Sequence, residues 1–233
     1  MLKDKKVVIF DMDGTLIDSV GIWNEVDRVL ISRIRQDGKQ TVEDTQLLRD
    51  RVLREFSKSQ NPYIDYCEAL GKLYSSELTA SEIHTLRYRI AQDYLKNVVD
   101  YKKYADIFIR ELKSCGYKLV IASTTRRDNM EIYRTDNSGI RAKANIDDYF
   151  TRVYTREDVS QIKPHPEVYL RVLSDLNVCA EECIVFEDSL VGVEASKAAG
   201  ITTVAVYDKY SENERDKINK LCDYSILSYS ELI

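Results

Sequence analysis

The chain has 233 residues and a formal net charge of −5, and 44% of its residues are hydrophobic while 31% are charged. This composition is typical of an ordered globular protein and excludes a disordered chain. The acidic balance, without a basic stripe, disfavours nucleic acid as a partner, and no apolar run approaches the length of a membrane span. We therefore expect a cytoplasmic protein with no membrane or nucleic-acid partner. A monomer or weak dimer is a separate expectation, which does not follow from the composition.

Five short apolar runs rich in β-branched residues predict strands, at residues 6–10, 117–122, 152–155, 183–187 and 202–206. Helix-like segments separate most of these runs, and such alternation predicts an α/β fold with a parallel sheet. The nearly continuous hydrophobicity of the first and fourth runs indicates strands that are covered on both faces.

The interval 18–96 shows no strand pattern, and its apolar residues recur at helical spacing. The three stripes are Trp23, Val26, Leu30 and Ile34; Tyr63, Cys67, Leu70 and Tyr74; and Ile83, Leu86, Ile90 and Tyr94. Thr79 and Glu82 form a capping-box pattern at the start of the last helix, while Gly38 and Asn61-Pro62 mark breaks. The sequence thus predicts a core domain of residues 1–17 and 97–233, with a helical domain of residues 18–96 inserted into it.

Two carboxylates leave the end of the first predicted strand, Asp11 and Asp13. Side chains at i and i+2 can point to the same side, and Gly14 permits a tight turn after them. Close carboxylates repel each other unless a cation or a shared proton relieves them, and Mg²⁺ prefers a few carboxylates together with water and phosphate oxygens. One carboxylate could then act as a nucleophile and the other as a general acid or base. For an isolated pair, a solvated turn is the alternative.

A second acidic pair, Glu187 and Asp188, follows the fourth predicted strand. Ligands of open α/β sheets bind at the carboxyl ends of the strands, so Asp188 is expected where a metal bound by Asp11 could be reached. Taken alone, the pair would be interpreted as an ordinary helix N-cap. In combination with the first pair it favours a metal site.

Two further segments carry groups that suit a phosphate. Ser123 and Thr124 follow the second predicted strand, and hydroxyls and backbone N–H groups at a strand-to-helix turn can hold an anion; an ordinary cap is the alternative. Lys163, fixed beside Pro164, is a compact cation that could neutralise phosphate and carboxylate charge.

Residues 11–15, Ser123, Lys163-Pro164 and Glu187-Asp188 resemble the four successive motifs of the haloacid dehalogenase (HAD) superfamily. The motifs occur in the family's order over essentially the whole chain, and the helical insert stands where the family places a cap. Residues 186–195 are similar to the β-phosphoglucomutase-like subgroup. The resemblance implies a HAD fold, with a Rossmann-like parallel-sheet core and an inserted α-helical cap domain.

The resemblance also implies a Mg²⁺-dependent phosphatase that hydrolyses a small phosphorylated metabolite, such as a sugar phosphate, through an aspartyl-phosphate. Asp11 would be the nucleophile and a metal ligand. Asp13 would be the general acid and base, with its backbone carbonyl on the metal. Ser123 and the N–H of Thr124 would hold the phosphoryl group, whose charge Lys163 would neutralise.

The remaining metal ligand implied by the resemblance is Asp188. Glu187 would be either a further ligand or a residue that holds the ligands in place. A phosphomutase is the main alternative, but β-phosphoglucomutases carry a histidine at the place of Trp23, and no histidine lies near it here. A phosphonatase would need a cap lysine, for which Lys58, Lys72 and Lys96 are available. A dehalogenase is disfavoured because it does not need Asp13. A non-catalytic phosphate- or metal-binding module is the alternative outside enzymes.

Two features bear on specificity. Cap residues that could contact a substrate, or form a solvated helix face, are Trp23, Arg49, Arg51, Arg54 and Lys58. Residues 133–146 depart from the subgroup's plain helix and short turn, and we interpret them as a local insertion that forms a surface loop; a contact with the cap or with a partner is the alternative.

Overall fold

The structure is a computed structural model that describes residues 1–37, 45–55 and 62–233. Contacts divide the chain into two compact units, Met1–Val20 with Val99–Ile233, and Gly21–Val98. We call them the core unit and the helical unit. Gly38, Lys58 and Asn61 lie outside the described residues. Whether the helical unit serves as a cap stays a prediction.

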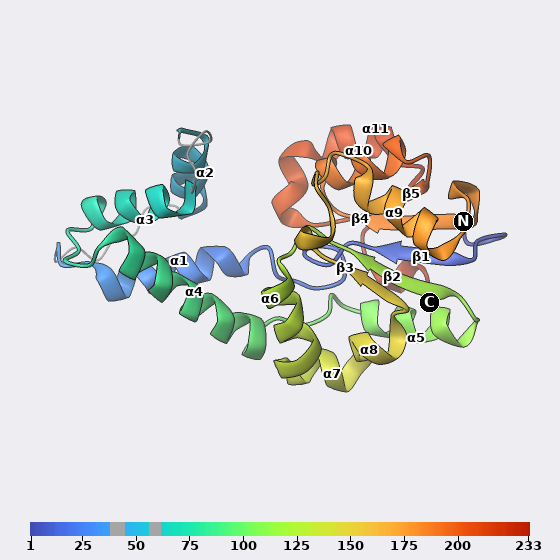
Figure 1. Ribbon diagram of the computed structural model, residues 1–233, viewed down its shortest axis with the longest axis horizontal. Helices are drawn as coiled ribbons and strands as arrows, with labels where there is room; N and C mark the ends of the chain where they lie inside the picture. Colours follow the sequence, from blue (N-terminus) through green and yellow to red (C-terminus); the bar gives the residue numbers. More distant parts are fainter. Residues whose placement is uncertain (38–44, 56–61) are drawn as a thin grey trace. The chain divides into compact units, whose positions relative to one another are not determined.

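The described part of the core unit contains one sheet of six parallel strands (Figure 1). They are β1 (Val7–Phe10), β2 (Lys118–Ala122), β3 (Arg152–Tyr154), β4 (Cys183–Glu187), β5 (Thr202–Val206) and β6 (Tyr224–Ile226), in the spatial order β3-β2-β1-β4-β5-β6. The predicted α/β class and parallel sheet are confirmed. The order reverses beside β1, and that reversal is where open α/β sheets bind ligands.

Helices cover both faces of this sheet. Figure 1 shows α9, α10 and α11 on one side and α5, α7 and α8 on the other. The helices of the core unit are α5 (Ala105–Ser114), α6 (Arg127–Glu131), the π-helix η1 (Ile132–Asp136), α7 (Ser138–Ala144), α8 (Ile146–Tyr149), α9 (Glu167–Leu176), α10 (Leu190–Ala198) and α11 (Arg215–Leu221).

The central strand β1 is buried along its whole length, as its unbroken apolar run predicts. Val7 and Ile9 belong to the cluster that includes Tyr169 of α9. On the other face Phe10 stacks on Phe186, with ring centroids 5.0 Å apart. Full burial of such side chains stabilises the fold by roughly 1.5–3 kcal/mol each, so β1 is the rigid support on which the next residue, Asp11, is mounted.

The register of the sheet brings three strand ends together. Phe10 pairs with Ile121 of β2 on one side and with Phe186 of β4 on the other. The backbone N–H of Asp11 donates to the Phe186 carbonyl at 3.0 Å, which extends the β1–β4 ladder by one residue. The side chains that follow β1, β2 and β4 therefore meet at one edge.

The two segments that lead out of the core unit and back into it are paired with each other. Asp18 N–H donates to the Asp100 carbonyl at 3.0 Å, and Lys102 N–H donates to the Leu16 carbonyl at 2.8 Å. Ile17 forms an antiparallel bridge with Tyr101 between these bonds. The chain therefore leaves the core unit and re-enters it at a fixed point, beside the turn that follows β1.

The segment 133–146 corrects a prediction, because it is not a surface loop. It continues α6 as the π-helix η1 and then forms α7. Tyr133, Ile140 and Ala144 are fully buried. An apolar residue at each of these turns gives the segment a core-facing side. Of the polar residues that suggested a loop, Thr135, Asp136 and Ser138 are exposed, whereas Asn137 is buried.

The helical unit consists of α1 (Ile22–Ile34), α2 (Thr45–Glu55), α3 (Pro62–Leu73) and α4 (Ala80–Asn97). The capping box is confirmed, since Thr79 N–H donates to Glu82 and Glu82 N–H donates to the Thr79 hydroxyl. The stripe of α3 is displaced from the prediction: Tyr63 is exposed, and Tyr66 is buried instead.

A buried ion network joins these helices. The Asp27 carboxylate, fully buried, accepts from Arg87 at 2.6 Å and from Arg49 at 2.8 Å. The Arg87 guanidinium lies 4.9 Å from the Trp23 ring centre. Arg49 is therefore held by a buried partner, whereas Arg51 is exposed. The side chain of Arg54 lies outside the described residues.

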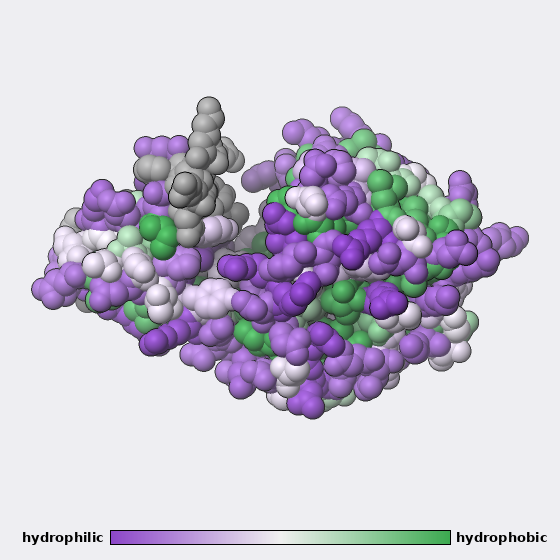
Figure 2. Space-filling view, in the orientation of Figure 1, coloured by the Kyte–Doolittle hydropathy of each residue, from purple (hydrophilic) through white to green (hydrophobic). Residues whose placement is uncertain are grey.

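Hydrophilic side chains dominate the face shown in Figure 2. Within the ranges 1–37, 45–55 and 62–233, no helix combines the length and the apolar character that crossing a membrane requires.

Candidate active site

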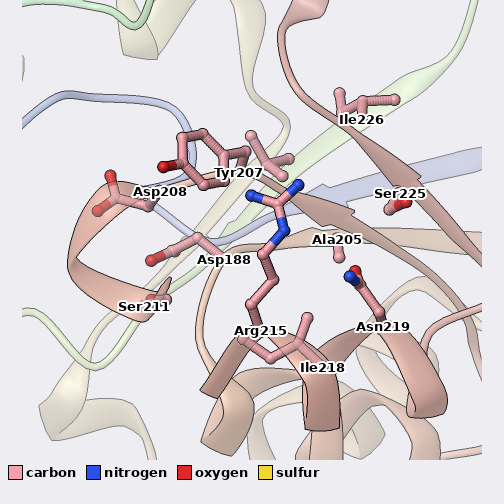
Figure 3. Close-up of a pocket in the computed structure, with 11 residues that line it drawn as sticks. Asp188, Ala205, Tyr207, Asp208, Ser211, Arg215, Ile218, Asn219, Ser225 and Ile226 are labelled. Carbon is pink, nitrogen blue, oxygen red and sulfur yellow. The ribbon is translucent and has the colours of Figure 1, made fainter. Parts of the chain in front are cut away.

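A small hollow lies where β4, β5 and β6 end. Its lining includes Asp188, Asp208 and Arg215, and the Arg215 guanidinium lies 4.4 Å from the Tyr207 ring centre (Figure 3). Its volume of about 20 Å³ is enough for one water molecule and too small for a substrate. This hollow by itself therefore cannot hold a substrate.

Lys163 connects the ends of the three strands β1, β2 and β4. Its side chain is 2% exposed, and its ammonium group donates to Asp11 Oδ1 at 2.6 Å, to Glu187 Oε1 at 2.5 Å and to the Ala122 carbonyl at 2.9 Å. Three acceptors satisfy all three N–H donors. Burial alone lowers the pKa of Lys163, but the charges of Asp11 and Glu187 outweigh it and hold the pKa well above its usual value. Lys163 is thus a permanent cation at neutral pH.

Asp11 lies against this cation with its carboxylate largely buried. Burial raises the pKa of Asp11 to about 7, the Lys163 charge opposes that rise, and the Glu187 charge adds to it. A carboxyl group whose pKa lies so close to neutral pH is a candidate functional group.

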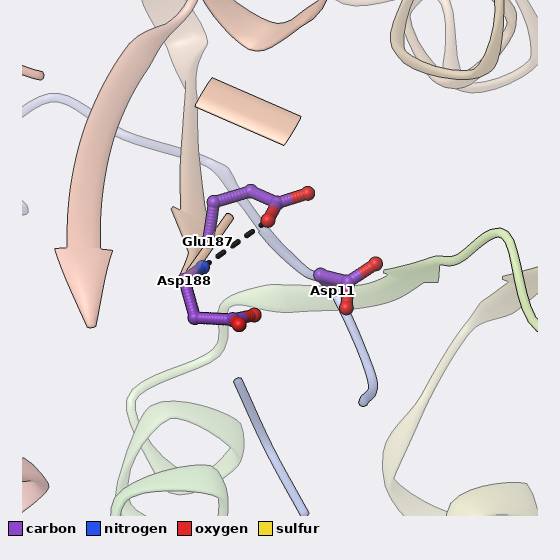
Figure 4. A group of neighbouring side chains, drawn as sticks. All are labelled: Asp11, Glu187 and Asp188. Atoms are coloured by element: carbon purple, nitrogen blue, oxygen red, sulfur yellow. Dashed lines mark hydrogen bonds between the residues drawn. The ribbon is translucent and has the colours of Figure 1, made fainter. Parts of the chain in front are cut away.

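Glu187 is fully buried, and both of its oxygens are engaged. Oε1 accepts from Lys163 and from the Tyr169 hydroxyl at 2.9 Å. Oε2 accepts from the Asp188 N–H at 3.1 Å, the bond drawn in Figure 4. It also accepts from the Ser189 hydroxyl at 3.2 Å. A Cβ atom on Gly192 would lie 1.9 Å from this carboxylate, so the first turn of α10 must carry glycine there. Glu187 is therefore fixed in place from four sides.

Asp188 completes a group of three buried carboxylates. Oxygens of Asp11, Glu187 and Asp188 lie within 4.8 Å of one another (Figure 4). The Thr15 hydroxyl donates to Asp188 at 2.7 Å. Burial raises the pKa of Asp188 well above its usual value, and the charges of Glu187 and Asp11 add to that rise.

The donor set of this group fits a hard divalent cation. Lys163 bonds Asp11 and Glu187, which leaves Asp188 with a neutral donor and a repulsive field from its neighbours. Oxygen ligands of this kind are the ones that Mg²⁺ prefers. Gly14, at φ +85°, keeps space beside Asp188, because a Cβ there would lie 2.4 Å from Asp188 Oδ2.

The Asp13 carboxylate is not one of the three grouped carboxylates. Three hydroxyls hold it: Ser19 and Tyr133 donate to Oδ1 at 2.5 Å and 3.2 Å, and Thr125 donates to Oδ2. Burial raises the pKa of Asp13, and the bonds from Ser19 and Tyr133 act against it. A carboxyl group with a raised pKa is suited to carrying a proton.

Ser123 and Thr124 follow β2 at the same edge. Ser123 is buried, and its hydroxyl oxygen accepts from the Thr125 N–H at 3.1 Å, which leaves its proton for an outside acceptor. Thr124 is exposed. The structure therefore gathers the predicted residues around the carboxyl ends of β1, β2 and β4.

Sequence reasoning missed the residues that hold the others, namely Ser19, Thr125, Tyr133 and Tyr169. Each contributes a hydroxyl to Asp13 or Glu187. Thr125 stands two residues after Ser123 and could have been suspected from that spacing. The tyrosines carry no local signal, because their partners are distant in sequence.

Of the lysines considered for a phosphonatase, Lys72 is exposed and pairs with Glu68.

The comparisons with known proteins agree on one family. The model of the haloacid dehalogenase-like hydrolases matches residues 8–206. The phosphorylated carbohydrates phosphatase of Thermotoga maritima is 33% identical over 201 residues, covering 85% of this chain and 83% of the relative. Pyrophosphatase PpaX of Bacillus cereus is 28% identical over 201 residues, covering 85% and 82%.

A solved structure from Thermotoga maritima, provisionally named as a β-phosphoglucomutase, aligns with a TM-score of 0.73 at 25% identity, covering 95% of this chain and 94% of that chain. Its similarity extends over both units. The resemblance read from the four motifs is thus confirmed. The chain belongs to the haloacid dehalogenase-like hydrolases, and is an enzyme of the phosphohydrolase type.

Proposed function

We propose that this enzyme is a Mg²⁺-dependent phosphatase that hydrolyses a small phosphate monoester, such as a sugar phosphate, through a phosphorylated Asp11. The observation that carries the proposal is the fixed Asp11–Lys163 pair beside a carboxylate, Asp188, that has no cationic partner among the described residues. A 33% identical relative named for phosphorylated carbohydrates supports the substrate class. We propose further that the helical unit serves as the cap.

In the first half-reaction an oxygen of Asp11 attacks the phosphorus, and the bond from phosphorus to the ester oxygen breaks. Asp13 gives its proton to that leaving oxygen. Lys163, the Ser123 hydroxyl and the Thr124 N–H hold the phosphoryl oxygens, because transfer of this kind depends on positioning and charge stabilisation. In the second half-reaction Asp13 removes a proton from water, which attacks the phosphorus and releases Asp11.

Asp11, Asp188 and the Asp13 carbonyl would hold Mg²⁺, and Glu187 would be a further ligand or support for the site. The bound ion would supply positive charge that offsets the repulsion between carboxylate and phosphate. The four partners of Glu187 favour the supporting role, because both of its oxygens are already engaged.

Phosphate release tests the proposal. Wild type, Asp11→Asn and the control Asp216→Asn, which changes an exposed side chain on α11, are assayed on sugar phosphates, nucleotides and an aryl phosphate, with Mg²⁺ or with a chelator. We expect release that needs Mg²⁺, is retained in the control, and falls at least about 10³-fold in Asp11→Asn.

Other outcomes point elsewhere. Isomerisation of β-glucose 1-phosphate without net release would establish a phosphomutase, although Trp23 stands where that subgroup carries histidine. Uptake of Mg²⁺ and phosphate with no turnover of any ester would leave a binding module.

A further inference from the structure

Asp13 has an unsymmetrical set of partners. Oδ1 accepts two hydroxyls, from Ser19 at 2.5 Å and from Tyr133 at 3.2 Å. Oδ2 accepts one, from Thr125. Since a carboxylate oxygen offers about two lone-pair positions, Oδ1 is saturated. Oδ2 keeps an open position beside a hydroxyl that can rotate.

Tyr133 reaches Asp13 because its helix changes pitch. The Asn137 N–H donates to the Ile132 carbonyl at 2.8 Å, an i to i+5 bond that widens the turn between them. Such π-turns shift the direction of the side chains they carry and are frequent at functional sites. Tyr133 is 1% exposed, so its hydroxyl contacts Asp13 from the interior of the protein.

The π-turn is itself anchored. Asn137 is buried, and its amide donates to the Val99 carbonyl at 2.8 Å while its side-chain oxygen accepts from the Ile140 N–H at 2.9 Å. The turn is thus tied to the chain segment that re-enters the core unit and to the first turn of α7. These bonds resist rotation of the turn, which would carry the Tyr133 hydroxyl off Asp13.

We propose that Tyr133 is a positioning residue for the general acid, and that with Ser19 it holds Asp13 Oδ1 so that the proton is delivered from Oδ2. This inference rests on the proposed phosphatase function. In the transfer step the Oδ2–H proton passes to the leaving oxygen as the phosphorus–oxygen bond breaks and the bond from Asp11 to phosphorus forms. Both bonds on Oδ1 persist, so the carboxylate does not turn as it loses the proton.

The consequence depends on the leaving group. An alkoxide leaving from a sugar phosphate needs the proton, whereas a nitrophenolate leaves without it. A misdirected Asp13 therefore slows attack on an alkyl phosphate and spares an aryl phosphate. A general loss of structure would slow both equally.

The test compares kcat/KM for a sugar phosphate and for p-nitrophenyl phosphate in wild type, Tyr133→Phe and the control Tyr101→Phe. The ratio kcat/KM covers only the steps through transfer to Asp11, so hydrolysis of the intermediate does not enter. Tyr101 is a matched control because its buried hydroxyl donates to the Ala144 carbonyl at 2.6 Å, away from Asp13.

We expect Tyr133→Phe to lower kcat/KM about tenfold or more for the sugar phosphate and by less than about twofold for the aryl phosphate. The control should change neither value. An equal loss on both esters, or no loss on either, overturns the inference. If thermal melting shows that Tyr133→Phe is unfolded, Ser19→Ala, which removes the other donor to Oδ1, decides by the same criterion. Failure of wild type to hydrolyse either ester with Mg²⁺ would instead overturn the proposed function.

Discussion

Removal of the Lys163 ammonium tests the electrostatics of the site most directly. In Lys163→Met the methyl thioether fills similar space, but Asp11 and Glu187 lose their shared cation while remaining buried. Breaking a buried ion pair from one side costs about 3–5 kcal/mol. A carboxylate can escape part of that cost by taking up a proton. For a glutamate side chain whose unperturbed pKa in water is about 4.3, this protonation costs roughly 4 kcal/mol at pH 7.5. Both routes give a loss of about 4 kcal/mol in the free energy of unfolding.

Urea unfolding at pH 7.5 measures this loss in the presence of a chelator and then of saturating Mg²⁺. The loss should be smaller with Mg²⁺, because a divalent ion can replace the missing charge. Lys197→Met is the matched control, since the Lys197–Asp223 pair lies on the surface at 2.8 Å and is worth about 0–1 kcal/mol. A loss in Lys163→Met no larger than in the control, or one that Mg²⁺ leaves unchanged, refutes the reasoning.

Two further predictions concern metal binding and the helical unit. The pKa of Asp11 is raised from 3.8 to about 7 in the fold, so the folded state keeps a proton that the unfolded chain has lost, and metal-free stability should fall as pH rises from about 4 to 7. Mg²⁺ must displace that proton, so its apparent affinity, measured by thermal shift, should weaken about tenfold per pH unit below 7; an affinity that does not change with pH contradicts this. In the helical unit, Arg87→Met breaks the buried pair with Asp27 and should destabilise that unit by about 3 kcal/mol, as reported by fluorescence of Trp23, the chain's one tryptophan; the exposed-pair control Arg28→Met should change it by less than about 0.5 kcal/mol, and equal effects would disprove the network's importance.

The sequence by itself determined the features that depend on neighbouring residues. Strands buried on both faces must be apolar throughout, so β1 and β4 could be located almost to the residue. The capping box at Thr79 uses groups three residues apart and was equally visible. β6 escaped notice because it is a three-residue strand with two exposed residues, which leaves no pattern to detect.

The gathering of the candidate site followed from one topological rule, that ligands bind at the carboxyl ends of parallel strands. Asp11, Ser123 and Asp188 could be placed together because each directly follows a strand. That rule fixes which edge of the sheet a side chain occupies, but not what holds it there.

Only the tertiary structure decided how these side chains are held. Tyr133 and Asp13 are 120 residues apart, and Tyr169 and Glu187 belong to different elements. The Tyr133 hydroxyl reaches Asp13 because of the π-turn of η1, and the Tyr169 hydroxyl reaches Glu187 because α9 packs against the sheet. No local propensity encodes either contact, because each one results from the positions of elements that meet only when the whole core unit has folded.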